Sequence, residues 1–441
     1  MNIMTTIFAF ASGHGRCGVS VVRVSGPQAL VAARKLCPSL PEKPTARQAY
    51  FTNLCDLRGQ NLDHILLLYF PAPHSFTGEN VVEFQCHGSP YILETVLSSL
   101  AQIPDFRMAE PGEFTRRAFE NGKLDLTQAE GLYDLIHSQT EAQHHLALGQ
   151  LNGQLSEQYQ AWHDRLKQLL SYAEAAIDFA DEELPDGFQQ QIDEKIEQLS
   201  QQVEAHISGS KGEQIREGFS VVILGAPNVG KSSLINVLSK KELAIVSDIA
   251  GTTRDMIETS VQLNGQLVVF VDTAGLNKTP RDAVEAEGIR RARQRAENAD
   301  LKIVMLSVDH LEWPLGLEKD DKTVVVINKV DQHMPDMPAD IQALNPFMLS
   351  VKDGKGIADL LCHIGKILSN LNKEAVPLTR VRHRIALEHT LYWLNEALNV
   401  PEVGLLAESL RCAMRELGGI TGRVDVEDLL DVIFADFCIG K

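Results

Sequence analysis

The residues whose types and spacing suggest chemistry are concentrated between positions 225 and 352. The first group, GAPNVGKS from Gly225 to Ser232, follows an apolar run and precedes a helical pattern. In such a loop the backbone N–H groups wrap phosphates, the lysine reaches the β- and γ-oxygens, and the serine hydroxyl binds Mg²⁺. This motif alone is compatible with several nucleotides, so the residues after it must indicate which base is bound.

Three later motifs narrow the choice of nucleotide. Asp272-Thr-Ala-Gly275 ends an apolar strand pattern, and Asp272 is placed to hold Mg²⁺ through water. In the intervening GTTRD motif, Thr253 is expected to close over Mg²⁺ only when a triphosphate is bound. Asn328-Lys-Val-Asp331 ends a later strand, and the carboxylate of Asp331 can accept from guanine N1–H and the 2-amino group, which adenine does not offer. The ordered set predicts a GTP site.

Ser350-Val351-Lys352 is expected to support the guanine from its other side, in a mild departure from the more common Ser-Ala-Lys. The predicted GTP-binding residues are Asn228, Val229, Gly230, Lys231, Ser232, Ser233, Ser247, Asp248, Ile249, Ala250, Gly251, Thr252, Thr253, Asp272, Thr273, Ala274, Gly275, Asn328, Lys329, Asp331, Ser350, Val351 and Lys352.

Leu276 stands where small signalling GTPases have a glutamine that orients the attacking water. A leucine cannot orient water, so hydrolysis requires another polar group and another positive charge. Three acidic residues in the following stretch are candidates for the polar group: Asp282, Glu285 and Glu287. Asn228 can help to coordinate a monovalent cation that replaces an arginine finger.

Composition limits the classes of protein that carry such a site. A chain of 441 residues with 44% hydrophobic and 23% charged residues predicts a soluble globular protein of about two or three domains. We expect no membrane span and no export signal, because the apolar start lacks a basic region. The seven cysteines are scattered without CxxC pairs, which favours a reducing cytoplasm. The net charge of −18 disfavours a broad basic surface for nucleic acid, so a local patch or a partner must attract any such substrate.

The pattern along the chain predicts a multidomain protein. Residues 1–121 alternate short β-rich runs with turns, residues 122–216 have helical periodicity, residues 217–374 alternate strands and helices in the manner of a doubly wound sheet, and residues 375–441 are helical again. Neither helical segment has an obvious core of its own. We therefore expect an N-terminal α/β domain and a discontinuous all-α helical domain, into which an α/β P-loop GTPase domain is inserted.

At this point the chain resembles, essentially from end to end, the bacterial tRNA-modification GTPase family known as MnmE or TrmE. The resemblance rests on GAPNVGKS, DIAGTTRD, DTAGL, SFTGE, PGEFTRRAF, LDLTQAEGLYDLI and the terminal FCIGK. It implies an N-terminal domain that binds a folate one-carbon donor, 5-formyl- or methylene-tetrahydrofolate, and forms a homodimer. It also implies that a flavin-dependent partner, MnmG, joins in adding a carboxymethylaminomethyl or aminomethyl group at C5 of the wobble uridine of certain tRNAs.

The resemblance further implies that potassium stimulates GTP hydrolysis by bringing two G domains together. Carried onto this chain, K⁺ is held by Asn228, Ser247, Ile249 and Thr252, and Mg²⁺ by Ser232 and Thr253. The family's catalytic glutamate lies in a Val-Glu-x-x-Gly context. This chain has one more residue before that context, so the assignment to Glu285, over Glu287, rests on the flanking residues.

The resemblance assigns folate contacts to Arg23, Glu83, Lys123 and Lys441. Each also has an ordinary interpretation: a polar residue on a strand, a solvated glutamate, or a surface lysine at a helix start. The functional interpretation of Glu83 has a chemical logic, because a pterin presents N3–H and a 2-amino group much as guanine does. Cys438, predicted as a catalytic residue, is either a packing cysteine or a participant in the modification chemistry.

Two alternatives stay open at this stage. One is a GTP-dependent switch that binds rRNA in ribosome assembly, although such proteins usually carry a basic RNA-binding module and none is obvious here. The other is a scaffold whose GTPase only controls assembly with a partner.

Overall fold

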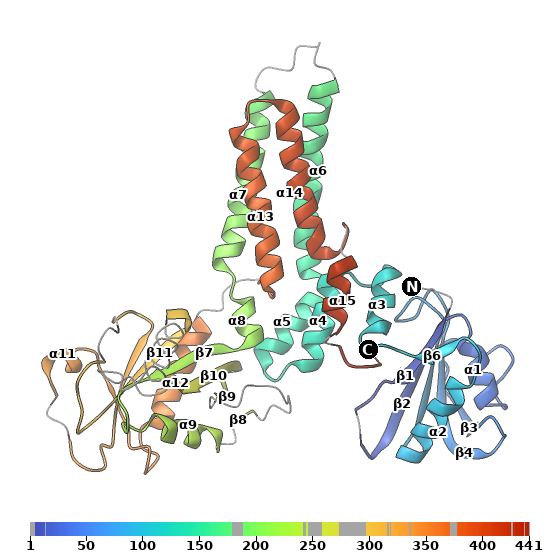
Figure 1. Ribbon diagram of the computed structural model, residues 1–441, viewed down its shortest axis with the longest axis horizontal. Helices are drawn as coiled ribbons and strands as arrows, with labels where there is room; N and C mark the ends of the chain where they lie inside the picture. The colour runs from blue at the N-terminus through green and yellow to red at the C-terminus, as the bar shows by residue number, and fades with distance from the viewer. Residues whose placement is uncertain are drawn as a thin grey trace, which may run out of the picture. The chain divides into compact units, whose positions relative to one another are not determined.

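The computed structural model describes residues 5–440 except 14, 179–187, 241–243, 246–257, 273–296, 315–316, 318, 335–336, 371–376, 425–426 and 436. The chain divides into two compact units, whose helices and strands are labelled in Figure 1. The first unit comprises residues 1–133, 150–170 and 411–441, and the second comprises residues 134–149 and 171–410. The four-segment division at positions 121, 216 and 374 stays a prediction.

The first unit contains a six-stranded sheet with the order β3-β4-β5-β2-β1-β6. Its strands are β1 (Thr6–Phe10), β2 (Cys17–Ser25), β3 (Tyr50–Cys55), β4 (Asn61–Phe70), β5 (Val81–Gly88) and β6 (Phe106–Met108). Helices α1 (Ala29–Leu36) and α2 (Pro90–Ala101) supply buried residues to one face, where Phe8, Val22 and Phe84 form a core with Ala33 and Leu100. Alternation along β2 places Val22 and Val24 in this core and Arg23 on the opposite face.

Among the described residues, packing on the opposite face of this sheet is concentrated near β1. Near β1, Ile7 and Ala9 pack with Phe114 of α3 (Glu113–Glu120). Towards β3, Phe51 pairs with Leu66 across the strands, and these two side chains are 75% and 42% exposed. We call this uncovered part, with Val19, Phe51 and Leu66, the open face.

The C-terminal residues of the chain belong to the first unit. Phe434 of α15 (Glu427–Ala435) and Phe437 pack with Leu126 and Ala129 of α4 (Leu126–His137). Beyond them, Ile439 forms an antiparallel bridge with Pro111. The two ends of the sequence are therefore joined in one folded unit.

The second unit contains a seven-stranded sheet with the order β13-β12-β11-β7-β10-β9-β8. Its strands are β7 (Phe219–Leu224), β8 (Ala244–Ile245), β9 (Glu258–Leu263), β10 (Gln266–Asp272), β11 (Leu301–Ser307), β12 (Thr323–Asn328) and β13 (Phe347–Met348). The strands from β13 to β10 pair in parallel, whereas β9 and β8 are antiparallel. The helices that the structure describes in this module are α9 (Lys231–Ser239), α11 (Ala339–Gln342) and α12 (Ile357–Asn370). We call residues 219–370 the nucleotide module.

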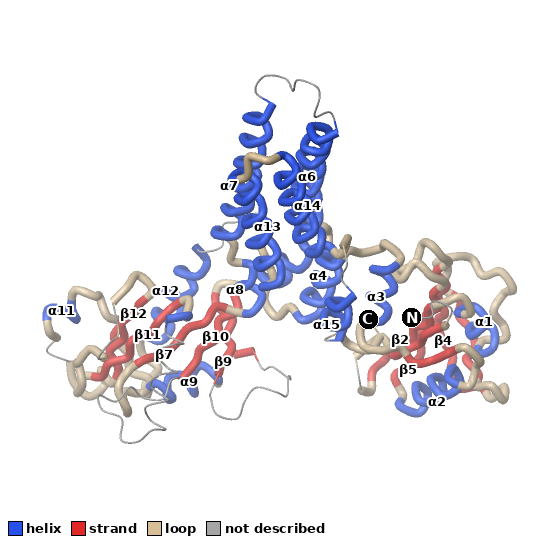
Figure 2. Tube along the Cα trace, turned by 45° about the horizontal axis from the view of Figure 1, so that its top comes forward, coloured by secondary structure: helices blue, strands red, loops and turns tan. Residues whose placement is uncertain are grey.

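Helices flank the nucleotide module on both sides in the sequence. Before it come α5 (Glu141–Leu151), α6 (Gln154–Asp178), α7 (Phe188–Gly209) and α8 (Gly212–Glu217), and after it come α13 (Val381–Asn399) and α14 (Val403–Thr421). Helices α7 and α13 pack against each other, so the module is inserted into a helical domain, as predicted (Figure 2). None of the helices that the structure describes is long and apolar enough to cross a membrane.

Helix α13 confirms the helical pattern expected after residue 375. Leu387 and Leu394 are buried in it, whereas Ile385 is 46% exposed. Two polar residues, His383 and Thr390, take inward positions that a purely apolar pattern does not reveal.

Candidate nucleotide site and N-terminal polar site

The phosphate-binding loop begins where β7 ends. Gly225, Asn228 and Gly230 all have positive φ, at 154°, 64° and 111°. A Cβ on Gly225 would lie 2.2 Å from the carbonyl oxygen of Met305, so only glycine allows the loop to approach β11 this closely. The loop then opens α9 at Lys231, whose first-turn N–H groups have no helical partners and favour an anion.

Lys231 lies inside this loop. Its side chain is buried, and its Nζ donates to the carbonyl oxygens of Gly225 and Ala226, each at 3.0 Å. Burial lowers the pKa of Lys231, while the charge of Asp272 acts in the opposite direction. The ammonium is therefore held by the loop that the motif predicts for the phosphates.

Ser232 and Asp272 meet at the start of α9. Ser232 Oγ donates to Asp272 Oδ2 at 2.6 Å, and Asp272 Oδ1 is buried without a hydrogen-bond partner among the described residues. Hydroxyl and carboxylate oxygens are the hard ligands that Mg²⁺ prefers, and a buried carboxylate oxygen without a donor is unfavourable unless a cation or water satisfies it. These residues fit a Mg²⁺ ion, which would stabilise the negative charge of a nucleoside triphosphate.

Asn328 ties the base side of the site to the phosphate loop. Its Nδ2 donates to the carbonyl oxygen of Val229 at 2.8 Å, and its Oδ1 accepts from the Val351 backbone N–H at 3.1 Å. A Cβ on Gly230 would lie only 2.3 Å from that Nδ2. The sequence placed Asn328 among the GTP contacts, but its role as a buried link between three segments became visible only in the fold.

Asp331 and Ser350 are brought together at the ends of β12 and β13. Ser350 Oγ donates to Asp331 Oδ1 at 2.9 Å, while Asp331 is exposed. An oriented and accessible carboxylate can accept from the two donors on the edge of a guanine.

Of the remaining predicted residues, Ser233 and Lys352 are exposed and Lys329 is half-buried. The others lie outside the described part of the chain: Ser247, Asp248, Ile249, Ala250, Gly251, Thr252, Thr253, Thr273, Ala274, Gly275 and Glu285.

The structure pairs two of the four predicted folate residues. Arg23 and Glu83 are cross-strand neighbours, and Arg23 Nε donates to Glu83 Oε1 at 2.9 Å with both side chains 17% exposed. The guanidinium lies over the rings of Phe76 and Phe114, at 5.6 and 5.7 Å from their centroids. Lys123 is exposed, and Lys441 lies outside the described residues.

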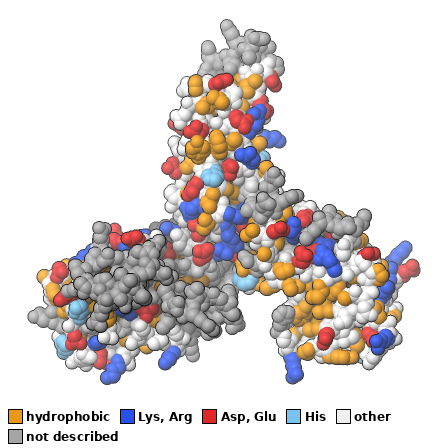
Figure 3. All heavy atoms as spheres, viewed as in Figure 1, with side chains coloured by type: hydrophobic (Ala, Val, Ile, Leu, Met, Phe, Trp, Pro, Cys, Tyr) orange, Lys and Arg blue, Asp and Glu red, His pale blue; other side chains and the backbone are white. Residues whose placement is uncertain are grey.

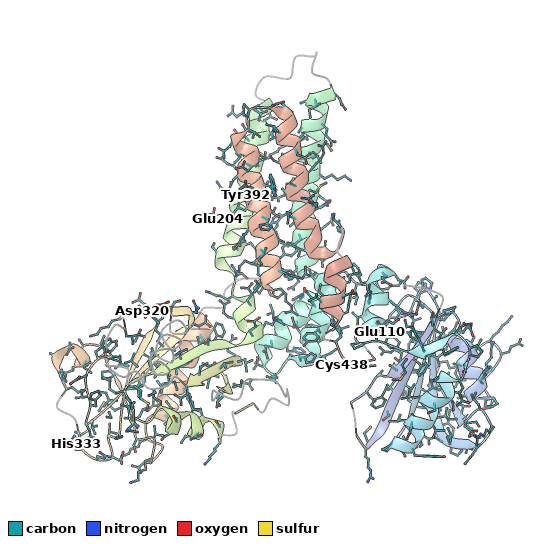
Figure 4. All side chains as sticks on the ribbon, viewed as in Figure 1. Glu110, Glu204, Asp320, His333, Tyr392 and Cys438 are labelled. Carbon is teal, nitrogen blue, oxygen red and sulfur yellow. The ribbon has the colours of Figure 1, made fainter. Side chains whose placement is uncertain are left out.

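The C-terminal tail reaches this pair. Arg23 Nη1 donates to the carbonyl oxygen of Gly440 at 3.4 Å, and a Cβ on Gly440 would lie 2.2 Å from the carbonyl oxygen of Phe10. Cys438 is exposed on the same tail, which follows α15 (Figure 4).

The motifs around residues 75–79 and 111–119 contain a charged network that the sequence did not predict. Glu113 accepts from Arg107 at 2.6 and 2.7 Å and from Arg117 at 3.0 Å, and Arg117 also donates to Glu79 at 3.0 Å. Burial by itself would raise the pKa of Glu113, but the hydrogen bonds from Arg107 and the Glu110 N–H, together with the two arginine charges, hold it below its ordinary value. Only the Glu113–Arg117 pair, four residues apart on a helix, has a spacing that signals contact.

Comparison with known proteins agrees with the geometry. The family model of the MnmE helical domain matches residues 126–438, and that of the GTP-binding protein TrmE N-terminus matches residues 6–123. The tRNA modification GTPase MnmE of Parvibaculum lavamentivorans is 47% identical over 455 residues, covering 99% of this chain and 100% of that protein. The mitochondrial 5-taurinomethyluridine-[tRNA] synthase subunit GTPB3 of Homo sapiens is 42% identical, covering 99% of this chain and 93% of its own.

The fold and the nucleotide site define a P-loop GTPase, an enzyme that hydrolyses GTP and uses Mg²⁺. The chain belongs to the MnmE family of tRNA modification GTPases.

Proposed function

We propose that this enzyme is a potassium-stimulated GTPase that acts with a flavin-dependent MnmG partner on tRNA. Together they add a carboxymethylaminomethyl or aminomethyl group at C5 of the wobble uridine, with a tetrahydrofolate derivative as the one-carbon donor. The observation that carries this proposal is the largely buried Arg23–Glu83 ion pair, to which the C-terminal tail is hydrogen-bonded. The chain that contains it is related along its whole length to proteins named for tRNA modification.

The chemistry of the Arg23–Glu83 pair suits a folate. A carboxylate that accepts one bond from a guanidinium has further lone pairs, and these can accept from the N3–H and 2-amino groups of a pterin. Arg23 has donors that suit a ring carbonyl or a carboxylate, and Phe76 and Phe114 keep its guanidinium in place. When bound, the folate would supply the one-carbon unit, while these residues orient it.

The open face of the N-terminal sheet supports the homodimer. Val19, Phe51 and Leu66 are 61%, 75% and 42% exposed. Figure 3 shows hydrophobic side chains gathered on the visible face of the N-terminal α/β domain. Exposed hydrophobic side chains that gather on one surface are typical of an interface. Light scattering should report a dimer for the wild type and a monomer for a Phe51→Glu, Leu66→Glu variant; dimers in both would exclude this face.

The potassium requirement is proposed from Asn228 and Leu276. Asn228 is exposed at a turn of the phosphate loop with φ of 64°, so its side-chain oxygen is available to a cation at the phosphate end of the site. Leu276 offers no group that could orient water. GTP turnover should be much faster in KCl than in NaCl at the same concentration, and Asn228→Ala should remove this difference. Equal rates in the two salts would exclude the cation.

Nucleoside analysis of tRNA tests the whole proposal. A strain lacking this protein should lose the modified wobble uridine, the wild-type gene should restore it, and Arg23→Ala should not. Normal modification in the deletion strain would overturn the proposal. A defect in ribosome assembly with normal modification would favour the rRNA-binding alternative, which the similarity over the helical and N-terminal domains does not favour.

A further inference from the structure

Asp134, near the end of α4, holds two arginines that come from distant segments of the chain. Arg380 contacts both carboxylate oxygens of Asp134: its Nη2 donates to Oδ1 at 2.9 Å, and its Nη1 lies 2.8 Å from Oδ2. Arg216 adds Nε to Oδ1 at 3.1 Å. The side chain of Asp134 is only 12% exposed, so these charge-assisted bonds form largely out of water, where they are strong.

The two arginines mark the places where the chain enters and leaves the nucleotide module. Arg216 lies on α8, just before β7, and Arg380 is the residue that precedes α13. The two crossings run side by side: the Leu378 N–H donates to Ser210 Oγ, and a Cβ on Gly212 would lie 2.0 Å from the Leu378 carbonyl oxygen. Asp134 therefore joins both crossings to α4 through one carboxylate.

The residues that follow Asp134 make contacts just before the starts of β7 and β10, two of the strands that lead to the nucleotide site. Gln143 Nε2 donates to the carbonyl oxygen of Arg216 at 2.8 Å, just before β7. The Ala142 N–H donates to the carbonyl oxygen of Gly265 at 3.1 Å, just before β10. Strand β7 runs directly into the phosphate loop, and β10 ends at Asp272, so each strand is held at one end by residues 134–143 and carries nucleotide chemistry at the other.

We propose that Asp134 is a positioning residue that couples the nucleotide state of the module to helix α13 and to the crossing at residues 210–217. A parallel strand is stiff along its axis, so a shift of β7 or β10 that accompanies a change of nucleotide is passed to Arg216 and to residues 142–143. Asp134 passes it on to Arg380 and the first turn of α13. The proposal rests on the proposed function, in which GTP hydrolysis drives a change elsewhere in the protein.

Hydrogen–deuterium exchange of the full-length protein, with GDP or a non-hydrolysable GTP analogue, tests this coupling. In the wild type, exchange in residues 377–390 should differ between the two nucleotides. In Asp134→Asn, exchange in residues 225–240 should still differ between the two nucleotides. In residues 377–390, the ratio of the exchange rates with the two nucleotides should fall at least about fivefold, which is the lower end of usual couplings between sites. GTP turnover should stay within about threefold of the wild type, while tRNA modification falls.

Two further variants keep the test decisive. Arg380→Gln removes the two-point ion pair with Asp134 by changing the arginine, and it should have the same effect as Asp134→Asn. It therefore provides an independent test if Asp134→Asn folds poorly. Asp320→Asn breaks the 2.7 Å Lys302–Asp320 ion pair, which includes no residue of either crossing, and should behave as the wild type. The proposal is overturned if residues 377–390 show no nucleotide dependence in the wild type, if they keep it in both Asp134→Asn and Arg380→Gln, or if residues 225–240 lose it as well. A deletion strain with normal tRNA would instead refute the proposed function and leave the exchange result intact.

Discussion

The nucleotide site and the N-terminal charged network of Glu79, Arg107, Glu113 and Arg117 use charged residues in different ways. At the nucleotide site, the groups lie at strand ends or in the first turn of α9, and Asp272 keeps a buried oxygen without a partner among the described residues. In the N-terminal network, the four charged side chains largely satisfy one another. The first arrangement leaves bonding capacity for a ligand, whereas the second uses most of it to hold the fold. A motif rich in charge can therefore be a binding site or a framework, and only the partners of its atoms distinguish the two.

The largest expected effect sharpens the nucleotide side of this comparison. Glu285 lies outside the described residues and is assigned from sequence. Glu285→Ala should leave GTP binding nearly intact and reduce turnover by roughly 10²–10⁴-fold, the usual scale for a group that positions or activates water. Steady-state GTP hydrolysis measures this, with Glu287→Ala as the matched control. A crippled Glu287→Ala beside an active Glu285→Ala would move the catalytic assignment by two residues.

The next effect tests whether the N-terminal network is a framework. Glu113→Gln should lower the free energy of unfolding by roughly 3 kcal/mol at neutral pH, the lower end for removing one partner of a buried ion pair, because Arg107 stays partly solvated. The folded pKa of Glu113 is depressed, so its stabilisation is present above the unfolded pKa and is lost as pH falls through the folded pKa.

Urea unfolding of the wild type and Glu113→Gln at pH 7 and below pH 4 measures this dependence. The gap between the two proteins should narrow in acid, and GTP turnover at neutral pH should change little. A constant gap at both pH values would mean that shape, rather than charge, accounts for the role of Glu113.

A smaller effect concerns the buried link at Asn328. Asn328→Ala leaves the Val229 carbonyl and the Val351 N–H without their partner, which costs about 1–3 kcal/mol for each buried polar group left unsatisfied. Because these groups shape the loop on both sides of the nucleotide, we expect GTP affinity to fall by about 10- to 100-fold. Titration with a fluorescent GTP analogue checks this, and Asp340→Asn on the exposed part of α11 should bind as the wild type. Unchanged affinity would show that the loop is held without Asn328.

These two sites also show how far the sequence alone could lead. The phosphate loop, Asp272 and the Asn328–Asp331 motif could be predicted because short-range spacing places each group at a strand end, and strand ends converge in a parallel sheet. The apolar runs at 220–224, 267–271, 302–307 and 323–327 predict strands, because buried strands of a parallel sheet appear as continuous apolar runs, and β7, β10, β11 and β12 lie there.

Pairings made by tertiary structure could not be predicted in the same way. Arg117 and Glu79 are separated by 38 residues, and Asp134 and Arg380 by 246 residues, so no periodicity connects them. Thr390 of α13 is a polar residue on the buried side of a helix, and its hydroxyl donates to the Ala386 carbonyl oxygen at 2.8 Å. Local bonds of this kind make a polar residue acceptable in a core.

The smallest expected effect on GTP hydrolysis comes from the C-terminal tail, and it separates the two sites most directly. Deleting residues 438–441 removes the Pro111–Ile439 bridge and the Arg23–Gly440 hydrogen bond, while Phe437 keeps its place in the core with Phe434. Potassium-stimulated GTP turnover should therefore stay near the wild-type rate, because no described residue of the nucleotide site belongs to the tail. Folate binding should weaken and wobble-uridine modification should be lost. Cys438→Ser removes only the exposed thiol, so it should retain folate binding and lose modification if that thiol takes part in the chemistry. Full complementation by Cys438→Ser would show that the thiol has no chemical role and that the tail acts through its hydrogen bond to Arg23.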